Sequence, residues 1–170
     1  MAIKMGKKKS LPKKIIKKPV KKIKKLGVIQ VGQELLPPIG EYVEGVGRRK
    51  TAIARVRIYP HIKGDYATNG QPVGRYFGNV INAEGKYLAP LEITGNNGKF
   101  AIYAKVSGSG ISGQLSAVIH GLSRALVKWN PEFRPLLKKA GLLNRDSRMK
   151  ETRKIGMGGK ARRRRQSPKR

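Results

Sequence analysis

The chain has no cysteine among its 170 residues, so a disulfide framework and a cysteine-based metal site are both excluded. It has no apolar run of about 20 residues, the length that a membrane-spanning helix needs. No apolar segment of signal-peptide length follows the basic start, which is also poor in the Arg and Ser of organellar transit peptides. These absences favour a cytoplasmic location and a protein that does not work in a membrane.

Acidic residues are scarce as well: nine Asp and Glu stand against 39 Lys and Arg, giving a formal net charge of +30. The excess is concentrated at the two ends. Residues 1–40 hold twelve Lys and one Glu, and residues 141–170 hold twelve bases and two acids. Because self-repulsion of this size destabilises a compact monomer, we expect a polyanionic partner, with RNA or DNA the obvious one.

Both ends are also short of core-forming residues. After Leu143 the only clearly apolar residues are Met149, Ile155, Met157 and Ala161. Such segments cannot offset their own ordering entropy, so we expect them to order only on a partner. We therefore predict an N-terminal extension over 1–40, a globular domain over 41–143 and a basic tail over 144–170. A solubility tail, a localisation signal and, for the extension, a membrane-surface helix remain as alternatives.

The central region mixes strand and helix patterns, which predicts a small α+β domain. Strands are expected over residues 42–46, 51–59, 66–68 and 99–106, with a turn at Asn69-Gly70. Alternation in the second strand defines two faces. The core face would carry Ala52, Ala54, Val56 and Ile58, and the other face Ile53, Arg55, Arg57 and Tyr59.

Helical patterns follow in three places. Residues 76–89 are helical only in part, since Gly78 and Gly85 interrupt the pattern. A firm helix begins with Ser112 as its N-cap and carries one apolar stripe. The stripe consists of Leu115, Val118, Ile119, Leu122, Leu126 and Trp129, and Trp129 is interpreted as a core residue. A shorter helix has Asn130 as N-cap and Pro131 as first residue, and Gly141 ends it.

The segment Gly108-Ser109-Gly110-Ile111-Ser112-Gly113 fits the G-x-G-x-x-G pattern of dinucleotide-binding loops. A Rossmann unit also needs a second parallel strand that ends in an acid about 20 residues on, where this chain starts another helix. A cofactor-binding enzyme is therefore disfavoured. Two interpretations stay open: Gly108, Gly110, Ser112 and Gly113 contact a nucleic-acid phosphate, or the glycines only permit a tight turn.

Few residue patterns in the sequence indicate catalysis or metal binding. His61 and His120 lack acids at ligand spacing, and no Ser-His-Asp or paired-carboxylate pattern stands out, so we expect no enzyme, no metal and no cofactor. Arg48, Arg49 and Lys50 instead form a basic turn before the strand that carries Arg55 and Arg57. These five residues suit contacts to a phosphate backbone, and the alternative is an ordinary solvated turn.

Several motifs in the same order resemble one family, small-subunit ribosomal protein nine, over residues 41–170. They are Gly47-Arg48-Arg49-Lys50-Thr51-Ala52-Ile53-Ala54-Arg55-Val56, Tyr76-Phe77-Gly78, Gly108 to Gln114, His120 to Leu126, and Lys139 to Arg148. The final Lys169-Arg170 resembles bacterial-type members. Departures are the long Lys-rich start, the segment Ile155-Gly156-Met157-Gly158-Gly159, and Gln166-Ser167-Pro168, where relatives place an aromatic residue.

The resemblance implies a mostly antiparallel sheet with helices on one face and a left-handed β-α-β crossover. It implies a place in the head of the small ribosomal subunit beside other head proteins, with the tail reaching the transfer RNA in the peptidyl site through Lys169 and Arg170. The expected ribosomal-RNA-binding residues are Arg48, Arg49, Lys50, Arg55, Arg57, Gly108, Gly110, Ser112, Gly113, Arg124, Arg145, Arg148, Arg162, Arg163, Arg164 and Arg165. The alternative function is non-specific compaction of nucleic acid.

Overall fold

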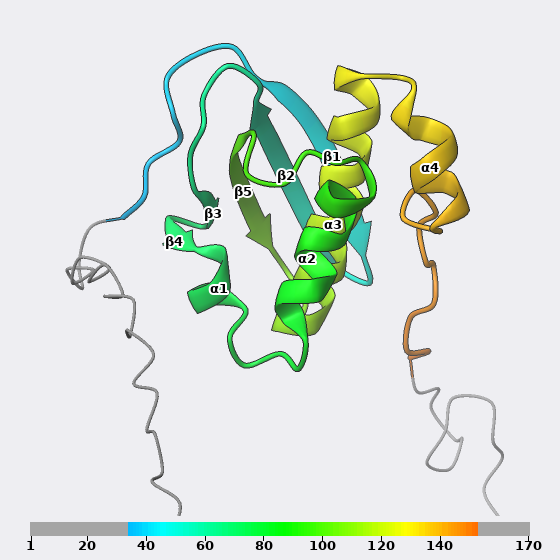
Figure 1. Ribbon diagram of the computed structural model, residues 1–170. Coiled ribbons are helices and arrows are strands. Elements are labelled where there is room, and N and C mark those ends of the chain that lie inside the picture. The colour runs from blue at the N-terminus through cyan, green and yellow to red at the C-terminus, as the bar shows by residue number, and fades with distance from the viewer. Residues whose placement is uncertain (1–33, 153–170) are drawn as a thin grey trace, which may run out of the picture. The chain divides into compact units, whose positions relative to one another are not determined.

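The computed structural model describes residues 34–152, which form five strands and four helices (Figure 1). The strands are β1 (Val43–Arg49), β2 (Ala52–Tyr59), β3 (Tyr66–Thr68), β4 (Gln71–Pro72) and β5 (Ala101–Ser107). The helices are α1 (Val73–Tyr76), α2 (Ala83–Ile93), α3 (Ile111–Trp129) and α4 (Phe133–Lys139).

The strands form one sheet in the order β1-β2-β5-β3-β4. All neighbouring pairs are antiparallel except β3 and β5, which run parallel and are connected in sequence through β4, α1 and α2. A parallel pair needs such a crossover, whereas antiparallel pairs can be joined by short turns. The predicted α+β class with a mostly antiparallel sheet is confirmed, and the left hand of the crossover stays a prediction.

One face of the sheet is covered by helices, with α2 and α3 lying against it in Figure 1. The predicted core face of β2 is confirmed, because Ala52, Ala54, Val56 and Ile58 have no exposed surface. They belong to one buried cluster with the α3 residues Leu115, Val118, Leu122 and Leu126. The alternation of small and branched apolar residues on β2 thus decides which face the helices occupy.

Strand β1 and helix α3 approach each other at three glycines. A Cβ atom on Gly47 would overlap the carbonyl oxygen of Ala117, and one on Gly121 would lie 2.9 Å from Cγ2 of Val56. Gly45 is equally crowded by the backbone of α3. Glycine is required here by space, since backbone atoms cannot retreat as a flexible side chain can.

Three side chains of α3 bond to the backbone at the free edge of β1. These bonds are Arg48 N–H to His120 Nδ1 at 3.3 Å, Arg124 Nη1 to Val46 O at 2.6 Å, and Lys128 Nζ to Glu44 O at 2.9 Å. Four helical residues rise about 6 Å and two strand residues about 6.6 Å, so the two spacings match. These three bonds, which we call the α3–β1 ladder, occupy backbone groups through which an edge strand would otherwise pair with another chain.

The first hairpin differs from the prediction in one respect. Strand β1 extends to Arg49, so Arg48 and Arg49 lie in a strand and only Lys50 and Thr51 form the turn. Lys50 adopts a positive φ of 51° to close it. The glycines before Arg48 look like turn residues in the sequence, but their role is the close packing of α3.

Helix α2 also differs from the prediction. The chain is broken at Gly78, as predicted, but Gly85 lies inside the helix and does not interrupt it. The helix continues to Ile93 because Tyr87 and Leu91 are buried in the core. Tertiary packing here outweighs the low helical propensity of glycine.

The predicted starts of α3 and α4 are each wrong by two residues. Gly110, with an extended backbone, is the N-cap of α3, so Ser112 lies in its first turn. Helix α4 begins at Phe133, because Asn130 Oδ1 instead accepts the Glu132 N–H at 3.0 Å and forms a turn. Its end at Gly141 is confirmed, since Gly141 has a φ of 73° and Leu142 N–H bonds to Leu137 O at 3.0 Å.

Trp129 lies at the edge of the core. Its ring centroid is 4.9 Å from that of Phe100 and 5.8 Å from that of Phe133, yet the residue is 38% exposed. The prediction that Trp129 packs with apolar residues is right, but its burial is only partial. It closes the end of the apolar stripe where α3 meets α4.

Candidate nucleic-acid interface

Successive residues of β1 and β2 alternate between the helix-covered face of the sheet and its opposite face, which we call the open face. Side chains on the open face come from β1, β2 and β5. Tyr59 and Ala101 belong to this face but are buried at one end of it. The nine others from these strands are Glu44, Val46, Arg48, Ile53, Arg55, Arg57, Tyr103, Lys105 and Ser107. Four of these nine are cations and one is an acid, so three of the predicted contact residues, Arg48, Arg55 and Arg57, share one basic surface.

Arg57 is held in place by the protein itself. Its Nε donates to Glu44 Oε2 at 3.1 Å, and its guanidinium carbon lies 4.5 Å from the ring centroid of Tyr42. The hydrogen bond to Glu44 raises the pKa of Arg57. Because Glu44 and Tyr42 already occupy Arg57, the cations of the open face that keep no acidic partner within residues 34–152 are Arg48, Arg55 and Lys105.

Arg49 points to the other face and holds the beginning of the tail. Its Nη2 lies 3.0 Å from Asp146 Oδ2, and its Nη1 donates to the carbonyl oxygens of Asp146 at 3.3 Å and Arg148 at 2.7 Å. We call this arrangement the tail clamp. Its side chain is only 19% exposed, which leaves Arg49 less accessible to RNA than its neighbour Arg48.

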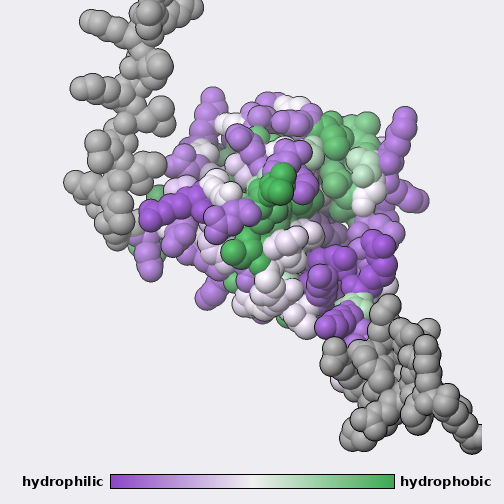
Figure 2. Space-filling view, turned by 90° about the horizontal axis from the view of Figure 1, so that it is seen from below, coloured by the Kyte–Doolittle hydropathy of each residue, from purple (hydrophilic) through white to green (hydrophobic). Residues whose placement is uncertain are grey.

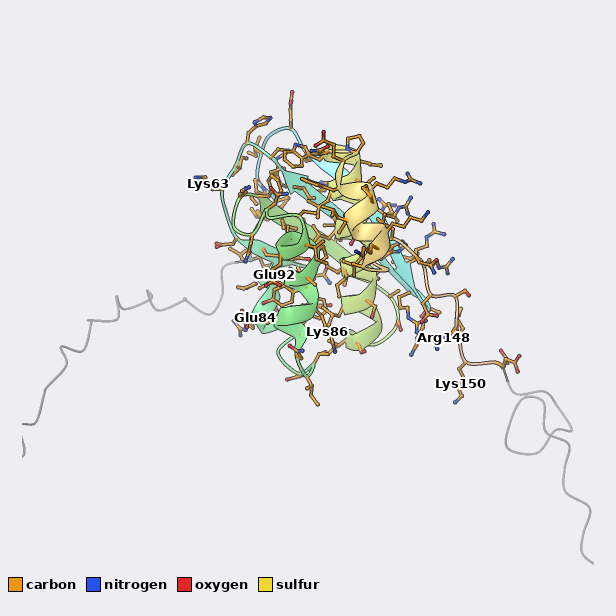
Figure 3. The ribbon with its side chains drawn as sticks, turned by 45° about the vertical axis from the view of Figure 1, so that its right-hand side comes forward. Lys63, Glu84, Lys86, Glu92, Arg148 and Lys150 are labelled. Atoms are coloured by element: carbon orange, nitrogen blue, oxygen red, sulfur yellow. The ribbon has the colours of Figure 1, made fainter. Side chains whose placement is uncertain are left out.

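Arg148 completes the tail clamp. Its guanidinium donates to both carboxylate oxygens of Asp146, at 2.8 Å to Oδ2 and 3.1 Å to Oδ1. The backbone N–H of Arg148 also donates to Oδ1, at 3.0 Å. These bonds, with the charge of Arg49, hold the pKa of Asp146 well below its usual range. The carboxylate therefore remains ionised throughout the neutral pH range, and the clamp does not titrate there. Figure 3 shows Arg148 and Lys150 on the segment that leaves the domain.

We expect Arg49→Ala to release the start of the tail without unfolding the domain. The Arg148 amide, whose acceptor Asp146 then loses one of its two cations, should exchange hydrogen several-fold faster. Arg48→Ala is the matched control, because it removes the same side chain one residue earlier from the opposite face. Hydrogen exchange followed by mass spectrometry over residues 144–150 provides the measurement. Equal exchange in the two variants would show that Arg49 does not direct the tail.

The glycine loop lies beside the basic turn. Gly108 has a φ of 79°, and a Cβ atom there would overlap the carbonyl oxygen of Thr51, so this glycine is explained by packing alone. Gly113 is also packed, with Ser109 Oγ 2.6 Å from the position of a Cβ atom. Gly110 has open space around it and an ordinary negative φ. Of the three glycines, only Gly110 is not required by packing, so its backbone is the one that suits contact with a phosphate.

The first turn of α3 follows this loop. Ser112 is exposed there, and its carbonyl accepts a bond from Ser116 Oγ at 3.1 Å. Since α3 is not followed by another strand within residues 34–152, this is not a Rossmann unit. No three His, Cys, Asp or Glu side chains in this range are grouped to hold a metal ion. None of its helices is long and apolar enough to cross a membrane.

A cavity of about 250 Å³ separates the end of β1 from the segment that follows α4. Its lining includes Arg48, Arg49, His120, Arg145 and Asp146. Burial and the charge of Arg124 lower the pKa of His120, although a hydrogen bond with the backbone of Leu143 opposes this. The imidazole is therefore neutral at pH 7, as its role as an acceptor from Arg48 N–H requires.

The lowered pKa of His120 predicts that the bonds between α3 and β1 weaken in acid. The pKa of His120 is lower in the folded than in the unfolded chain, so neutral His120 contributes to the stability of the fold. This stability is complete above about pH 6.5 and is lost as the pH falls through the pKa of the folded chain. His120→Gln keeps an acceptor that does not titrate. Melting temperatures between pH 7.5 and 5 should fall more for the natural chain than for the variant, and parallel curves would contradict the assignment.

The remaining predicted residues divide into two groups. Arg124, Arg145 and Arg148 lie on the β1 side of the domain, where Arg124 and Arg148 bond to the protein and Arg145 is exposed. Arg162 to Arg165, Lys169 and Arg170 lie outside the described residues. No sequence motif singles out Lys105, Tyr103 or Tyr42 as contact residues. The alternation within residues 101–107 indicates Tyr103 and Lys105 alone, by placing them opposite the core face.

Hydrophilic residues cover most of the face shown in Figure 2, and the hydrophobic ones gather in separate patches. A small α+β domain with a basic open sheet face and a basic tail held at its start defines the class of nucleic-acid-binding proteins.

Comparison with known proteins identifies the family. The family described as ribosomal protein S9/S16 matches residues 47–170, and the chain belongs to this family. Two relatives, both named small ribosomal subunit protein uS9, come from Anaeromyxobacter sp. (strain K) and Anaeromyxobacter dehalogenans (strain 2CP-1 / ATCC BAA-258). Each is 46% identical over 114 residues, which cover 67% of this chain and 86% of the relative. The resemblance seen in the motifs is thereby confirmed, and the chain is a ribosomal protein of the small subunit.

Proposed function

We propose that the protein is a structural, non-enzymatic constituent of the small ribosomal subunit that binds ribosomal RNA in the head of the subunit. The observation that carries this proposal is the open face, where Arg48, Arg55 and Lys105 have no acidic partner within the described residues. Phosphate contacts of this kind position a protein on RNA by the shape of its backbone. Lys50 and the backbone at Gly110 extend the same surface around the hairpin turn.

The tail gives the protein a second point of contact. The tail clamp fixes where it leaves the domain, and the chain from Arg148 to Arg170 would span roughly 75 Å if extended at about 3.3 Å per residue. We propose that Arg162 to Arg165 bind ribosomal RNA along this path. Lys169 and Arg170 then approach the transfer RNA in the peptidyl site. Association with neighbouring head proteins and a location in the cytoplasmic ribosome belong to the same proposal.

Sedimentation tests the proposal directly. A tagged copy of the full chain should co-sediment with small subunits in a sucrose gradient, at one copy per ribosomal RNA by quantitative mass spectrometry. The log of its affinity for this RNA should fall with the log of salt concentration, with a slope of about −0.7 to −0.9 per phosphate contact. Recovery with chromosomal DNA and absence from the small-subunit peak would instead support compaction of nucleic acid.

A further inference from the structure

We infer that the open face binds an unpaired stretch of RNA, with a phosphate held between Arg55 and Lys105 and a base against Tyr103. This inference rests on the proposed function and adds the kind of RNA and the residues that recognise it. Neither Tyr103 nor Lys105 belongs to the set expected from the sequence motifs.

The pairing of two cations points to an anion. Arg55 on β2 and Lys105 on β5 are directly opposite each other in the antiparallel register. Cβ atoms of such pairs lie about 5 Å apart, and like charges in this position are destabilising. Both residues are exposed, and neither makes an ion pair within residues 34–152. A phosphate between the two would turn this repulsion into two charge-assisted contacts.

The neighbouring residues supply surfaces for a base. Tyr103 lies two residues before Lys105 on the same face of β5 and is partly exposed, and Ile53 on β2 is 44% exposed. Tyr42, 46% exposed, packs against Tyr59 and Arg57 at the end of this face. An aromatic ring beside cations on an open sheet suits single-stranded RNA, because bases stack on the ring while cations hold the phosphates.

The same geometry argues against a duplex. The bases of a duplex are stacked inside it and cannot reach Tyr103, so a duplex would use only the cations. The ion pair of Arg57 with Glu44 occupies the acid on this face, so no carboxylate opposes a phosphate at Arg55. The charge of the open face therefore favours an RNA backbone, and the exposed ring of Tyr103 favours a strand whose bases are unpaired.

The variant Lys105→Glu tests the phosphate contact without destabilising the domain. The new carboxylate would face Arg55 and replace a like-charged pair by an opposite-charged one, so thermal stability should be unchanged or higher. Lys86→Glu is the matched control with the same net charge. Lys86 lies on α2, in the helix layer (Figure 3), and makes one exposed bond to Ile81 O at 3.2 Å.

Each variant would be produced alongside the natural chain, and their ratio measured in purified small subunits. Lys105→Glu should be under-represented about tenfold, as expected for losing one charge-assisted contact, whereas Lys86→Glu should compete nearly equally. Equal incorporation of both variants would overturn the inference while leaving the proposed function intact. Absence of the natural chain itself from small subunits would overturn the proposed function.

Because the chain has no cysteine, a probe attached to a single introduced cysteine can report which part of the RNA lies on the open face. Ile53→Cys, carrying a tethered iron chelate, should generate hydroxyl radicals that cleave ribosomal RNA at unpaired nucleotides in assembled subunits. Ile81→Cys, 89% exposed in the connection between α1 and α2, is the control and should give a different cleavage pattern. Cleavage from position 53 only within duplex regions, or none there beside clear cleavage from position 81, would overturn the inference and indicate a duplex or a protein on this face.

Discussion

Replacing Gly47 by alanine should destabilise the domain by about 3 kcal/mol or more, at the upper end for overpacked cores. The added methyl group would overlap the carbonyl oxygen of Ala117 and the backbone of Gly121. Because both neighbours are backbone atoms of one helix, the overlap is relieved only by moving α3 away from β1. That movement would stretch the ladder from His120 to Lys128 and open the buried cluster between sheet and helix.

Thermal unfolding of the full chain, followed by circular dichroism, measures this effect. A domain of about 100 residues loses 4–8 °C per kcal/mol, so a fall of more than about 12 °C is expected. Gly110→Ala is the control for stability, because it adds the same methyl group in open space at an ordinary φ. It should change the melting temperature by a few degrees at most. Similar values for the two variants would refute the close approach.

Deleting Lys169 and Arg170 should weaken binding of transfer RNA to the peptidyl site of purified small subunits by about 1–3 kcal/mol. The guanidinium of Arg170 suits bidentate contact with a phosphate, and Lys169 adds a second positive charge beside it. Pro168, which restricts its own φ and favours an extended Ser167, would stiffen this approach. Assembly should be unaffected, since the domain still binds.

Filter binding of transfer RNA to subunits with and without the two residues provides the test. Alanine at both Lys138 and Lys139 is the matched control, since it removes two positive charges from the exposed surface of α4. These subunits should bind transfer RNA normally. If the terminal deletion also leaves affinity, initiation and frame maintenance unchanged, the terminal pair does not contact transfer RNA, and redirection of the tail by Ser167-Pro168 would be examined next.

Local patterns in the sequence were sufficient for several parts of the fold. The alternation of Ala52, Ala54, Val56 and Ile58 predicted the buried face of β2, because successive strand residues must point to opposite sides. The spacing of Leu115, Val118 and Leu122 likewise predicted the buried stripe of α3. The ordered motifs identified the family. Helix starts were less accurate, since Asn130 has more than one way to bond to nearby backbone.

By itself the sequence determined the α+β class, the core faces, the basic character and the family, since these follow from local alternation, composition and motif order. Only the tertiary structure showed that Arg48 and Arg49, adjacent in the chain, serve different surfaces, and that Lys105 lies opposite Arg55. It also assigned Gly45, Gly47 and Gly121 to the contact between strand and helix. Strand register and close backbone approach join residues about 50 to 100 positions apart, so no local pattern encodes them.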